Sequence, residues 1–272
     1  MRALALISAC ALSGCVAYND PCQPLVDNPE KRVAYLASEV WIDKPNTRHA
    51  DNALAQAAAD AFVDVFKDSA APADFGVING GSLRAEGLCV TRNILPQGGL
   101  TNGTLYEVLL FANIMSAVTL TEDETWEMFE HSVEKLYTAP DPIAAPAGQF
   151  LQVSQGVKLT ADCTRPAGSR IVSLSIGGTA LQHPGRPMQS FRAALSAYLL
   201  GGGDGYAMLV APGMDPSRDP EQAQRLGGLD VNITSDYLQK NDNGSQADGL
   251  QLDAARVTLT NCSVPGRPAS AN

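Results

Sequence analysis

Four short segments of the sequence combine glycines with charged, amide or aromatic side chains that could carry chemistry. They are residues 79–84 (Asn-Gly-Gly-Ser-Leu-Arg), 110–113 (Leu-Phe-Ala-Asn), 150–154 (Phe-Leu-Gln-Val-Ser) and Tyr198 with the run 202–206 (Gly-Gly-Asp-Gly-Tyr). Glycine lets the backbone adopt positive φ or approach a ligand closely. A guanidinium can bind phosphate oxygens bidentately, and an ionised carboxylate, which only accepts hydrogen bonds, suits a vicinal diol. No single segment is specific, because lone aromatic residues often belong to a core and an Asp among glycines often belongs to a turn.

Motifs for bond-breaking chemistry are absent from the sequence. It has no G-x-S-x-G elbow, no P-loop and no H-E-x-x-H motif. A dinuclear metal site needs a dense set of His, Asp and Asn ligands around two ions about 3.5–4 Å apart, whereas His49, His131 and His183 stand in unrelated contexts. We therefore predict no catalytic residue and no metal ligand in this chain, and we expect all three histidines to be solvated.

Helix and strand patterns alternate irregularly along the chain, which predicts an α/β or α+β fold with a mixed sheet and flanking helices. A Thr-Glu-Asp-Glu capping box at 121–124 predicts a helix that runs to about residue 137. We expect the other helices at 51–66, 101–110 and 233–240, and strands at 31–42, 75–78, 114–120, 150–159, 170–176, 188–195 and 256–260. No internal repeat is visible.

The order and spacing of the four segments resemble the carboxyl-terminal, nucleotide-recognition domain of the 5′-nucleotidase family. That family's pattern runs N-x-G-G-I-R, then L-Y-x-x-x-P-F-x-N, then F-L-Q-V-S-G, then F-x-x-x-G-G-D-G-[YF], and the match extends roughly over residues 33–209. The resemblance implies the fold of that domain. The family's amino-terminal metallophosphatase domain has no counterpart in this sequence, so we expect divalent metals only in a separate partner.

The resemblance also implies a role for each of seven residues. Two aromatic rings sandwich the nucleobase in the family, and a stacked base is worth about 1–3 kcal/mol. The aspartate accepts hydrogen bonds from the ribose hydroxyls, the arginines contact phosphate, and the asparagines lie near the base. The matching positions here are Phe111 and Tyr198 for stacking, Asp204 for ribose, Arg84 and Arg48 for phosphate, and Asn79 and Asn113 for the base.

Several positions depart from the family pattern. Ser82 occupies a position where the family has Gly, Leu83 one where it has Ile, Leu110 one where it has Pro and Asp51 one where it has Glu. Tyr198 replaces Phe and is expected to add a hydroxyl near the base. The stretch 84–100 is also longer than usual. These departures affect the expected base preference and phosphate geometry more than binding itself.

The amino terminus has the pattern of an export signal. Arg2 precedes an apolar run at 3–12 that is too short to span a bilayer as a mature helix. The run ends in Leu-Ser-Gly-Cys at 12–15, which resembles a bacterial lipobox with Cys15 as the lipidated residue; the alternative is an ordinary secretory peptide cleaved nearby. Val16 after the cysteine is typical of outer-membrane sorting in Gram-negative bacteria. We expect a signal at 1–15, a tether at 16–30 and a folded domain at 31–265, lipid-anchored in the cell envelope.

The cysteines and the net charge agree with an exported small-molecule binder. Cys22, Cys89, Cys163 and Cys262 follow the signal, and an even number in an oxidising compartment predicts two disulfides, with three pairings open. A net charge of −10 argues against a nucleic acid polymer as a partner, because a field of that sign repels a phosphate backbone.

Three functions follow from these observations. The first is a lipoprotein that binds a purine nucleoside or nucleotide and is not catalytic alone. The second is the substrate-recognition part of a split 5′-nucleotidase, completed by a separate metallophosphatase chain. The third is an envelope structural protein with a vestigial pocket.

Overall fold

A computed structural model of the chain describes residues 26–87, 91–215, 217–218 and 228–266. The predicted lipidation site Cys15, most of the predicted tether, and Cys22 and Cys89 lie outside these residues.

The centre of the fold is a four-stranded mixed sheet in the order β6 (Met115–Thr121), β11 (Ser190–Ser196), β3 (Phe75–Asn79) and β7 (Leu151–Val153). Strand β11 runs parallel to β3, with Ala193 opposite Phe75, and antiparallel to β6. Strand β7 runs antiparallel to β3. The predicted mixed sheet is therefore confirmed.

A second four-stranded sheet has the order β10 (Thr179–Ala180), β9 (Ile171–Ile176), β8 (Val157–Asp162) and β12 (Val257–Thr260). Two small antiparallel pairs complete the strands: β1 (Arg32–Leu36) with β5 (Gly98–Thr101), and β2 (Val40–Trp41) with β4 (Ile94–Leu95). The helices are α1 (Lys44–Arg48), α2 (Ala53–Phe66), α3 (Asn102–Val108), α4 (Glu122–Val133), α5 (Ala197–Leu200), α6 (Val210–Met214) and α7 (Asp230–Asn241), and the short 3-10 turns are η1 (Gly80–Ser82), η2 (Gly203–Gly205) and η3 (Ala207–Leu209).

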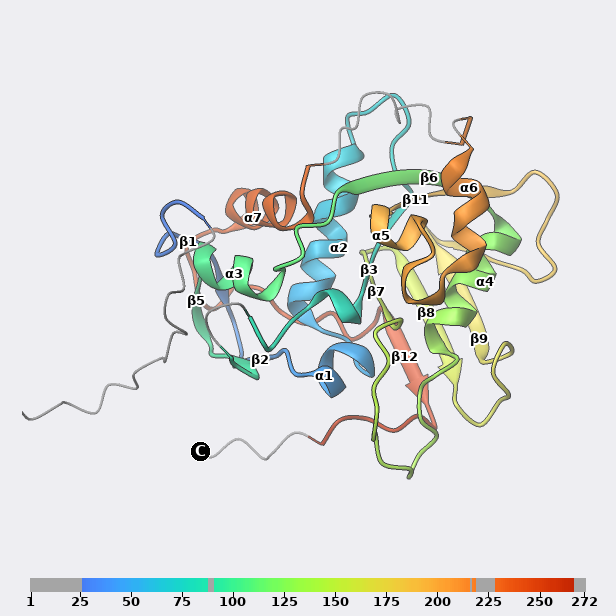
Figure 1. Cartoon of the computed structure of the whole chain (residues 1–272), viewed down its shortest axis with the longest axis horizontal. Helices are drawn as coiled ribbons and strands as arrows, with labels where there is room; N and C mark the ends of the chain where they lie inside the picture. Colours follow the sequence, from blue (N-terminus) through green and yellow to red (C-terminus); the bar gives the residue numbers. More distant parts are fainter. Residues whose placement is uncertain (1–25, 88–90, 216, 219–227, 267–272) are drawn as a thin grey trace, which may run out of the picture.

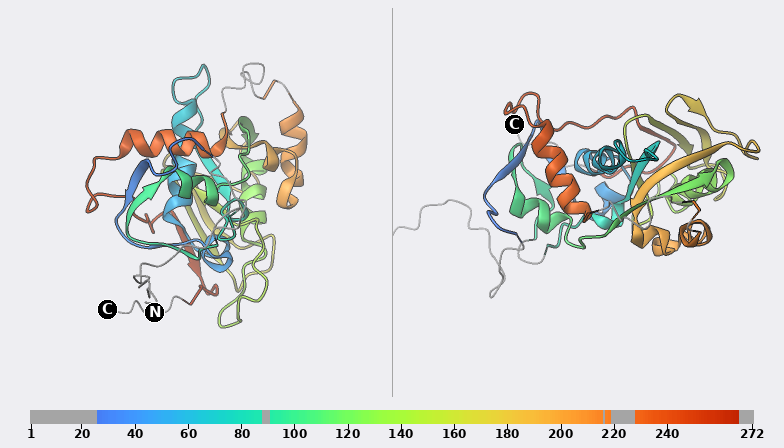
Figure 2. Two further views of the ribbon diagram at one scale, coloured as in Figure 1. Left: turned by 60° about the vertical axis from the view of Figure 1, so that its left-hand side comes forward. Right: turned by 90° about the horizontal axis from the view of Figure 1, so that it is seen from above.

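The central sheet separates two hydrophobic cores, because successive side chains of a strand point to opposite faces. On β11, Ala194 packs into one core while Ala193 and Leu195 pack into the other. The views in Figures 1 and 2 place α2 and α7 on one side of this sheet, and α4, β8 and β9 on the other. The strand ends and connecting loops then form an edge where distant parts of the sequence meet.

Local signals account for the starts of helices α2 and α4. Asn52 caps α2 by accepting from the amides of Leu54 and Ala55, each at 3.1 Å. The predicted capping box of α4 is present: the Thr121 hydroxyl accepts from the Glu124 amide at 3.2 Å, and the Glu124 carboxylate accepts from the Thr121 amide at 2.8 Å. Such reciprocal bonds satisfy amides that a helix start leaves without partners.

Several predicted elements differ in extent from those observed. The segment 31–42 forms two strands in different sheets, and 150–159 is divided into β7 and β8 by a turn in which Gly156 has a φ of 92°. Helix α4 ends at Val133 rather than near residue 137. Strand β11 begins at Ser190, after Met188, which is fully exposed with a φ of 71°.

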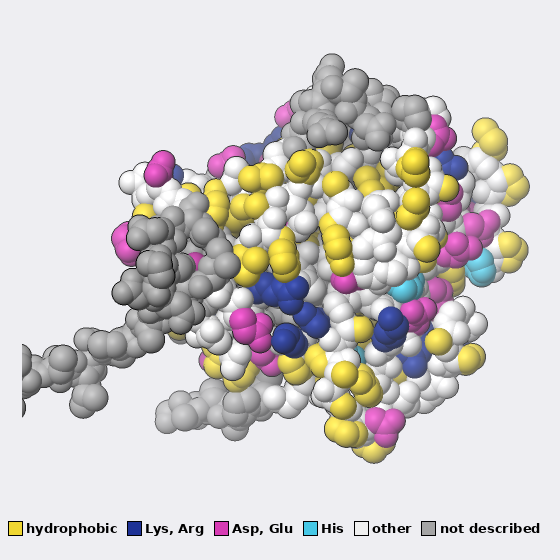
Figure 3. Space-filling view, viewed as in Figure 1, with side chains coloured by type: hydrophobic (Ala, Val, Ile, Leu, Met, Phe, Trp, Pro, Cys, Tyr) yellow, Lys and Arg dark blue, Asp and Glu magenta, His cyan; other side chains and the backbone are white. Residues whose placement is uncertain are grey.

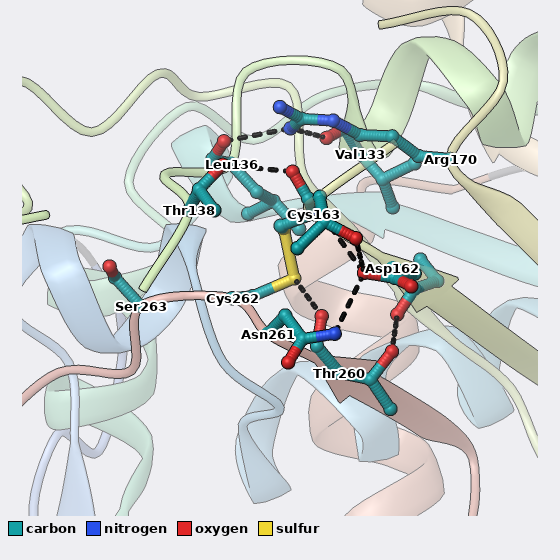
Figure 4. The surroundings of a disulfide bond; sticks show 12 residues. Val133, Leu136, Thr138, Asp162, Cys163, Arg170, Thr260, Asn261, Cys262 and Ser263 are labelled. Atoms are coloured by element: carbon teal, nitrogen blue, oxygen red, sulfur yellow. Dashed lines mark hydrogen bonds between the residues drawn. A yellow bond between two sulfur atoms is a disulfide. The ribbon is translucent and has the colours of Figure 1, made fainter. Parts of the chain in front are cut away.

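A disulfide joins Cys163 and Cys262, whose Cα atoms are 5.0 Å apart and which are 99 residues apart in sequence (Figure 4). It links the chain just after β8 to the chain just after β12, where the two strands run parallel. Around it, Thr138 donates to the Cys163 carbonyl at 2.8 Å and Asn261 donates to Asp162 at 3.0 Å. This pairing is one that the sequence left open. No helix in the described part of the chain is long and apolar enough to cross a membrane.

Candidate functional site

All seven predicted site residues line one cavity of about 350 Å³. They come from the end of α1, the end of β3 with the turn that follows it, the segment after α3, and α5 with η2. The lining consists of Arg48, Asn79, Gly81, Ser82, Arg84, Phe111, Asn113, Gly148, Tyr198 and Asp204. Figure 3 shows basic side chains gathered near the middle of the face seen in Figure 1, over α1 and the segment after β3, with hydrophobic side chains beside them.

Asp204 occupies a left-handed turn at the cavity wall, with φ 52° and ψ 20°. Asn79 donates to its Oδ2 at 2.6 Å, and the Tyr198 hydroxyl donates to its Oδ1 at 2.9 Å. A side chain at Gly148 would lie 2.9 Å from Oδ2, so a glycine there leaves room for the carboxylate. Since a carboxylate has about four lone-pair sites, the two protein donors leave acceptor capacity free.

Asn79 supports the carboxylate rather than reaching into the cavity as a free amide. It is 2% exposed, its Nδ2 binds Asp204, and its Oδ1 accepts from the Ser82 hydroxyl at 2.6 Å. Ser82, one of the departures from the family pattern, therefore helps to orient this asparagine.

The Tyr198 ring lies flat against Gly203. A β-carbon at Gly203 would fall 2.5–2.6 Å from three carbons of the ring, so this position must be glycine for the ring to lie there. The ring is 47% exposed. Its hydroxyl, which we expect near the base, donates to the carboxylate of Asp204 and accepts from the backbone amide of the same residue at 3.1 Å. Burial, followed by the hydrogen bond to Asp204, raises the pKa of this hydroxyl.

Phe111 is exposed to 47%, and the Arg84 guanidinium lies 4.6 Å from the centre of its ring. The next residue, Ala112, has a φ of 47°, a conformation that costs energy in a residue other than glycine. Asn113 then donates to the buried Asp230 carboxylate at 3.0 Å, and its carbonyl accepts from the Asp230 amide at 2.8 Å. Burial raises the pKa of Asp230 to about 6. These contacts set the direction of the Phe111–Asn113 segment.

Arg48 brings a second guanidinium to the same cavity. One of its Nη atoms donates to the Pro146 carbonyl at 2.8 Å, and its buried Nε has no hydrogen-bond partner among the described residues. Burial and then repulsion from Arg84 lower the pKa of Arg48. Two guanidiniums that repel one another across a cavity are suited to an anion, because an anion between them relieves the repulsion.

Gln152, in the third sequence segment, fixes the entry to α2 and so the position of Arg48. This side chain is fully buried, and its amide nitrogen donates to the carbonyls of Thr47 and Ala50 at 3.0 and 2.7 Å. Its carbonyl accepts from the Asn52 amide at 2.9 Å. Through these hydrogen bonds, Gln152 links β7 to the end of α1 and to the residues that lead into α2.

The expectation of solvated histidines is wrong for His49 and His131. His49 is 1% exposed, and burial lowers its pKa to about 4. His131 has a side chain only 13% exposed, and its Nε2 lies 2.9 Å from the Asp204 carbonyl oxygen. His183 is exposed as expected. Sequence reasoning missed His131 because Asp204, whose carbonyl it contacts, is 73 residues away along the chain. In the described part of the chain, no group of three or more His, Cys, Asp or Glu side chains could hold a metal ion.

The architecture is that of the carboxyl-terminal part of a 5′-nucleotidase. It superposes on a 5′-nucleotidase precursor from Thermus thermophilus with a TM-score of 0.62 and 23% identity, over 85% of this chain and 40% of that one. The sequence model of the 5′-nucleotidase C-terminal domain matches residues 33–211. The chain therefore belongs to this family of domains.

Relatives identified by sequence are proteins of greater length. An apyrase from Tabanus yao is 27% identical over 211 residues, which is 74% of this chain and 34% of the apyrase. A venom 5′-nucleotidase from Gloydius brevicauda is 30% identical over 168 residues, which is 60% of this chain and 25% of the enzyme. The matched region thus spans about a third or less of these relatives.

Proposed function

We propose that this protein binds a purine nucleoside or nucleotide in the cavity at α1, η1, α5 and η2. The observation that carries the proposal is the convergence of seven residues, from segments spread over more than 150 positions of sequence, around one cavity. The relatives carry the names apyrase and 5′-nucleotidase, which supports a nucleotide as the ligand class.

The three parts of such a ligand correspond to three kinds of group in the cavity. Two exposed aromatic rings, Phe111 and Tyr198, offer faces for a base. Asp204 keeps acceptor capacity for the vicinal hydroxyls of ribose. Arg48 and Arg84 line the same cavity and offer positive charge for a phosphate.

The direct test is calorimetric titration of the protein carrying Cys15→Ser with adenosine and AMP. Phe111→Ala should weaken both ligands about 5- to 150-fold, the value of one stacked base. Asp204→Asn should weaken both by about tenfold or more, the value of hydrogen bonds to a charged group. Arg48→Gln should weaken AMP more than adenosine, and more so at low salt, because a charge interaction is screened by ions.

Met188→Ala is the control, since Met188 is fully exposed and does not line the cavity. Absence of adenosine and AMP binding to the unsubstituted protein would reject the proposal and leave the third function, an envelope structural protein. If Phe111→Ala and Asp204→Asn both bind these ligands as tightly as the unsubstituted protein does, this cavity is not the binding site.

A second candidate is substrate recognition within a split 5′-nucleotidase. It is favoured by the relatives, which are named apyrase and 5′-nucleotidase and of whose length this chain matches about a third or less. In this case a separate metallophosphatase chain supplies the divalent metals, while this chain binds and orients the nucleotide. Phosphate release should then require Mn²⁺ and the second chain together. Release by this protein alone would contradict both candidates.

We further propose that Cys15 carries a lipid anchor that holds the protein at the bacterial cell envelope. The support is the Leu-Ser-Gly-Cys sequence at 12–15. Mass spectrometry of the mature amino terminus should find acylated Cys15. An unmodified terminus elsewhere would indicate ordinary secretion.

A further inference from the structure

The turn that carries Asp204 has a backbone conformation that needs support. A residue other than glycine in the left-handed region costs of order 1 kcal/mol and persists only where its surroundings hold it. Three contacts hold the Asp204 carboxylate and amide, and two of them come from Tyr198, which is half-exposed at the rim. The carbonyl oxygen of Asp204 is contacted by a different element, through Nε2 of His131 in α4 at 2.9 Å.

His131 is itself firmly placed. It lies in the last turn of α4, and its ring meets the fully buried Tyr206 edge-on, with centroids 4.6 Å apart and planes at 78°. Its Nδ1 lies 3.2 Å from a carboxylate oxygen of Glu134, and Gln149 donates to both that carboxylate and the His131 carbonyl. Because the Asp204 carbonyl only accepts, Nε2 must carry the proton in this contact.

We propose that His131 is a positioning residue for nucleoside recognition: it donates from Nε2 to the Asp204 carbonyl and so holds the left-handed turn that presents the carboxylate to the ribose. The inference rests on the proposed role of Asp204. Because His131 does not line the cavity, its effect on the ligand is indirect and passes from helix α4 through Asp204.

The test uses His131→Leu, which keeps bulk but removes the donor, and His131→Gln, whose amide can restore it. Adenosine and 2′,3′-dideoxyadenosine are titrated against each. His131→Leu should weaken adenosine about 3- to 10-fold, the size of one net hydrogen bond, and leave the dideoxy ligand nearly unchanged. His131→Gln should recover most of the adenosine affinity. His183→Leu, the same substitution at an exposed histidine, is the matched control.

A ligand-free measurement separates this inference from the proposed function. Amide hydrogen exchange of residues 202–206 should be faster in His131→Leu than in the unsubstituted protein, and restored in His131→Gln. If the unsubstituted protein binds adenosine and His131→Leu binds it equally well, the inference fails and the proposed function stands. If nothing binds adenosine, the proposed function fails, and the nucleoside role of His131 fails with it. If amide hydrogen exchange of residues 202–206 is the same in His131→Leu as in the unsubstituted protein, His131 does not support the turn, whatever the binding results.

Discussion

Gly203 is the position where the smallest change should have the clearest effect on the proposed site. An alanine there would put its methyl carbon 2.5–2.6 Å from Cζ and both Cε atoms of Tyr198. Non-bonded carbons prefer about 3.5–4.0 Å, so the ring must move by roughly 1 Å or rotate into solvent. Gly203 does not have positive φ, so the alanine backbone itself is unstrained and the effect is confined to the ring.

The expected loss follows from what the ring does. A displaced ring no longer presents its face beside Asp204, and its hydroxyl gives up the 2.9 Å bond to Oδ1. The loss of one stacking face is worth about 1–3 kcal/mol, or roughly 5- to 150-fold in affinity. Because Tyr198 is half-exposed, folding stability should change by less than about 1 kcal/mol.

The assay is calorimetric titration with adenosine, together with urea unfolding, for Gly203→Ala and Gly201→Ala. Gly201 is the matched control two residues away: its φ is −78°, and a β-carbon there would meet only the Ala197 and Tyr198 carbonyl oxygens, at 3.4 and 3.5 Å. Gly201→Ala should bind as the unsubstituted protein does. If Gly203→Ala binds adenosine undiminished and remains folded, Tyr198 does not stack on the base.

Two further predictions concern stability. Replacing Cys163 and Cys262 together by alanine opens a loop of 99 residues and should lower the free energy of unfolding by about 3–5 kcal/mol in urea titrations; a change below about 1 kcal/mol would show that the bond constrains little. Burial raises the pKa of Asp51 from 3.8 to about 7. The folded chain therefore keeps a proton that the unfolded chain loses, and this contribution to stability is present below pH 4 and lost as the pH rises to 7. Relative to Asp51→Asn, the unsubstituted protein should lose up to about 4 kcal/mol between pH 4 and pH 7.5; a constant difference across that range would mean that Asp51 is ionised throughout.

Much of the candidate site could be located from the sequence, because its glycines, arginines and aromatic residues follow the order of the 5′-nucleotidase family pattern. The positions so identified line one cavity. The start of helix α4 could also be predicted from the sequence, because the capping box at 121–124 is a local arrangement in which the interacting groups are only three residues apart.

The partners of these side chains could not be predicted in the same way. The hydrogen bond from the Tyr198 hydroxyl to Asp204 was not foreseen, and it forms because the turn at 202–205 folds back under the ring. His131 was expected to be solvated, yet it supports that turn from a helix 73 residues away in sequence. Neither contact follows from spacing, since both depend on how the chain packs.

The sequence by itself determined which residue types were available, where they recur and which helices begin with a cap, because these properties depend on neighbours along the chain. Only the tertiary structure decided that Arg48 and Arg84 share a cavity, that Asn79 and Tyr198 hold one carboxylate, and that Cys163 pairs with Cys262. The physical reason is that burial, hydrogen bonding and charge act over a few ångströms in space. Residues far apart in sequence reach those distances only when the two cores pack against the central sheet.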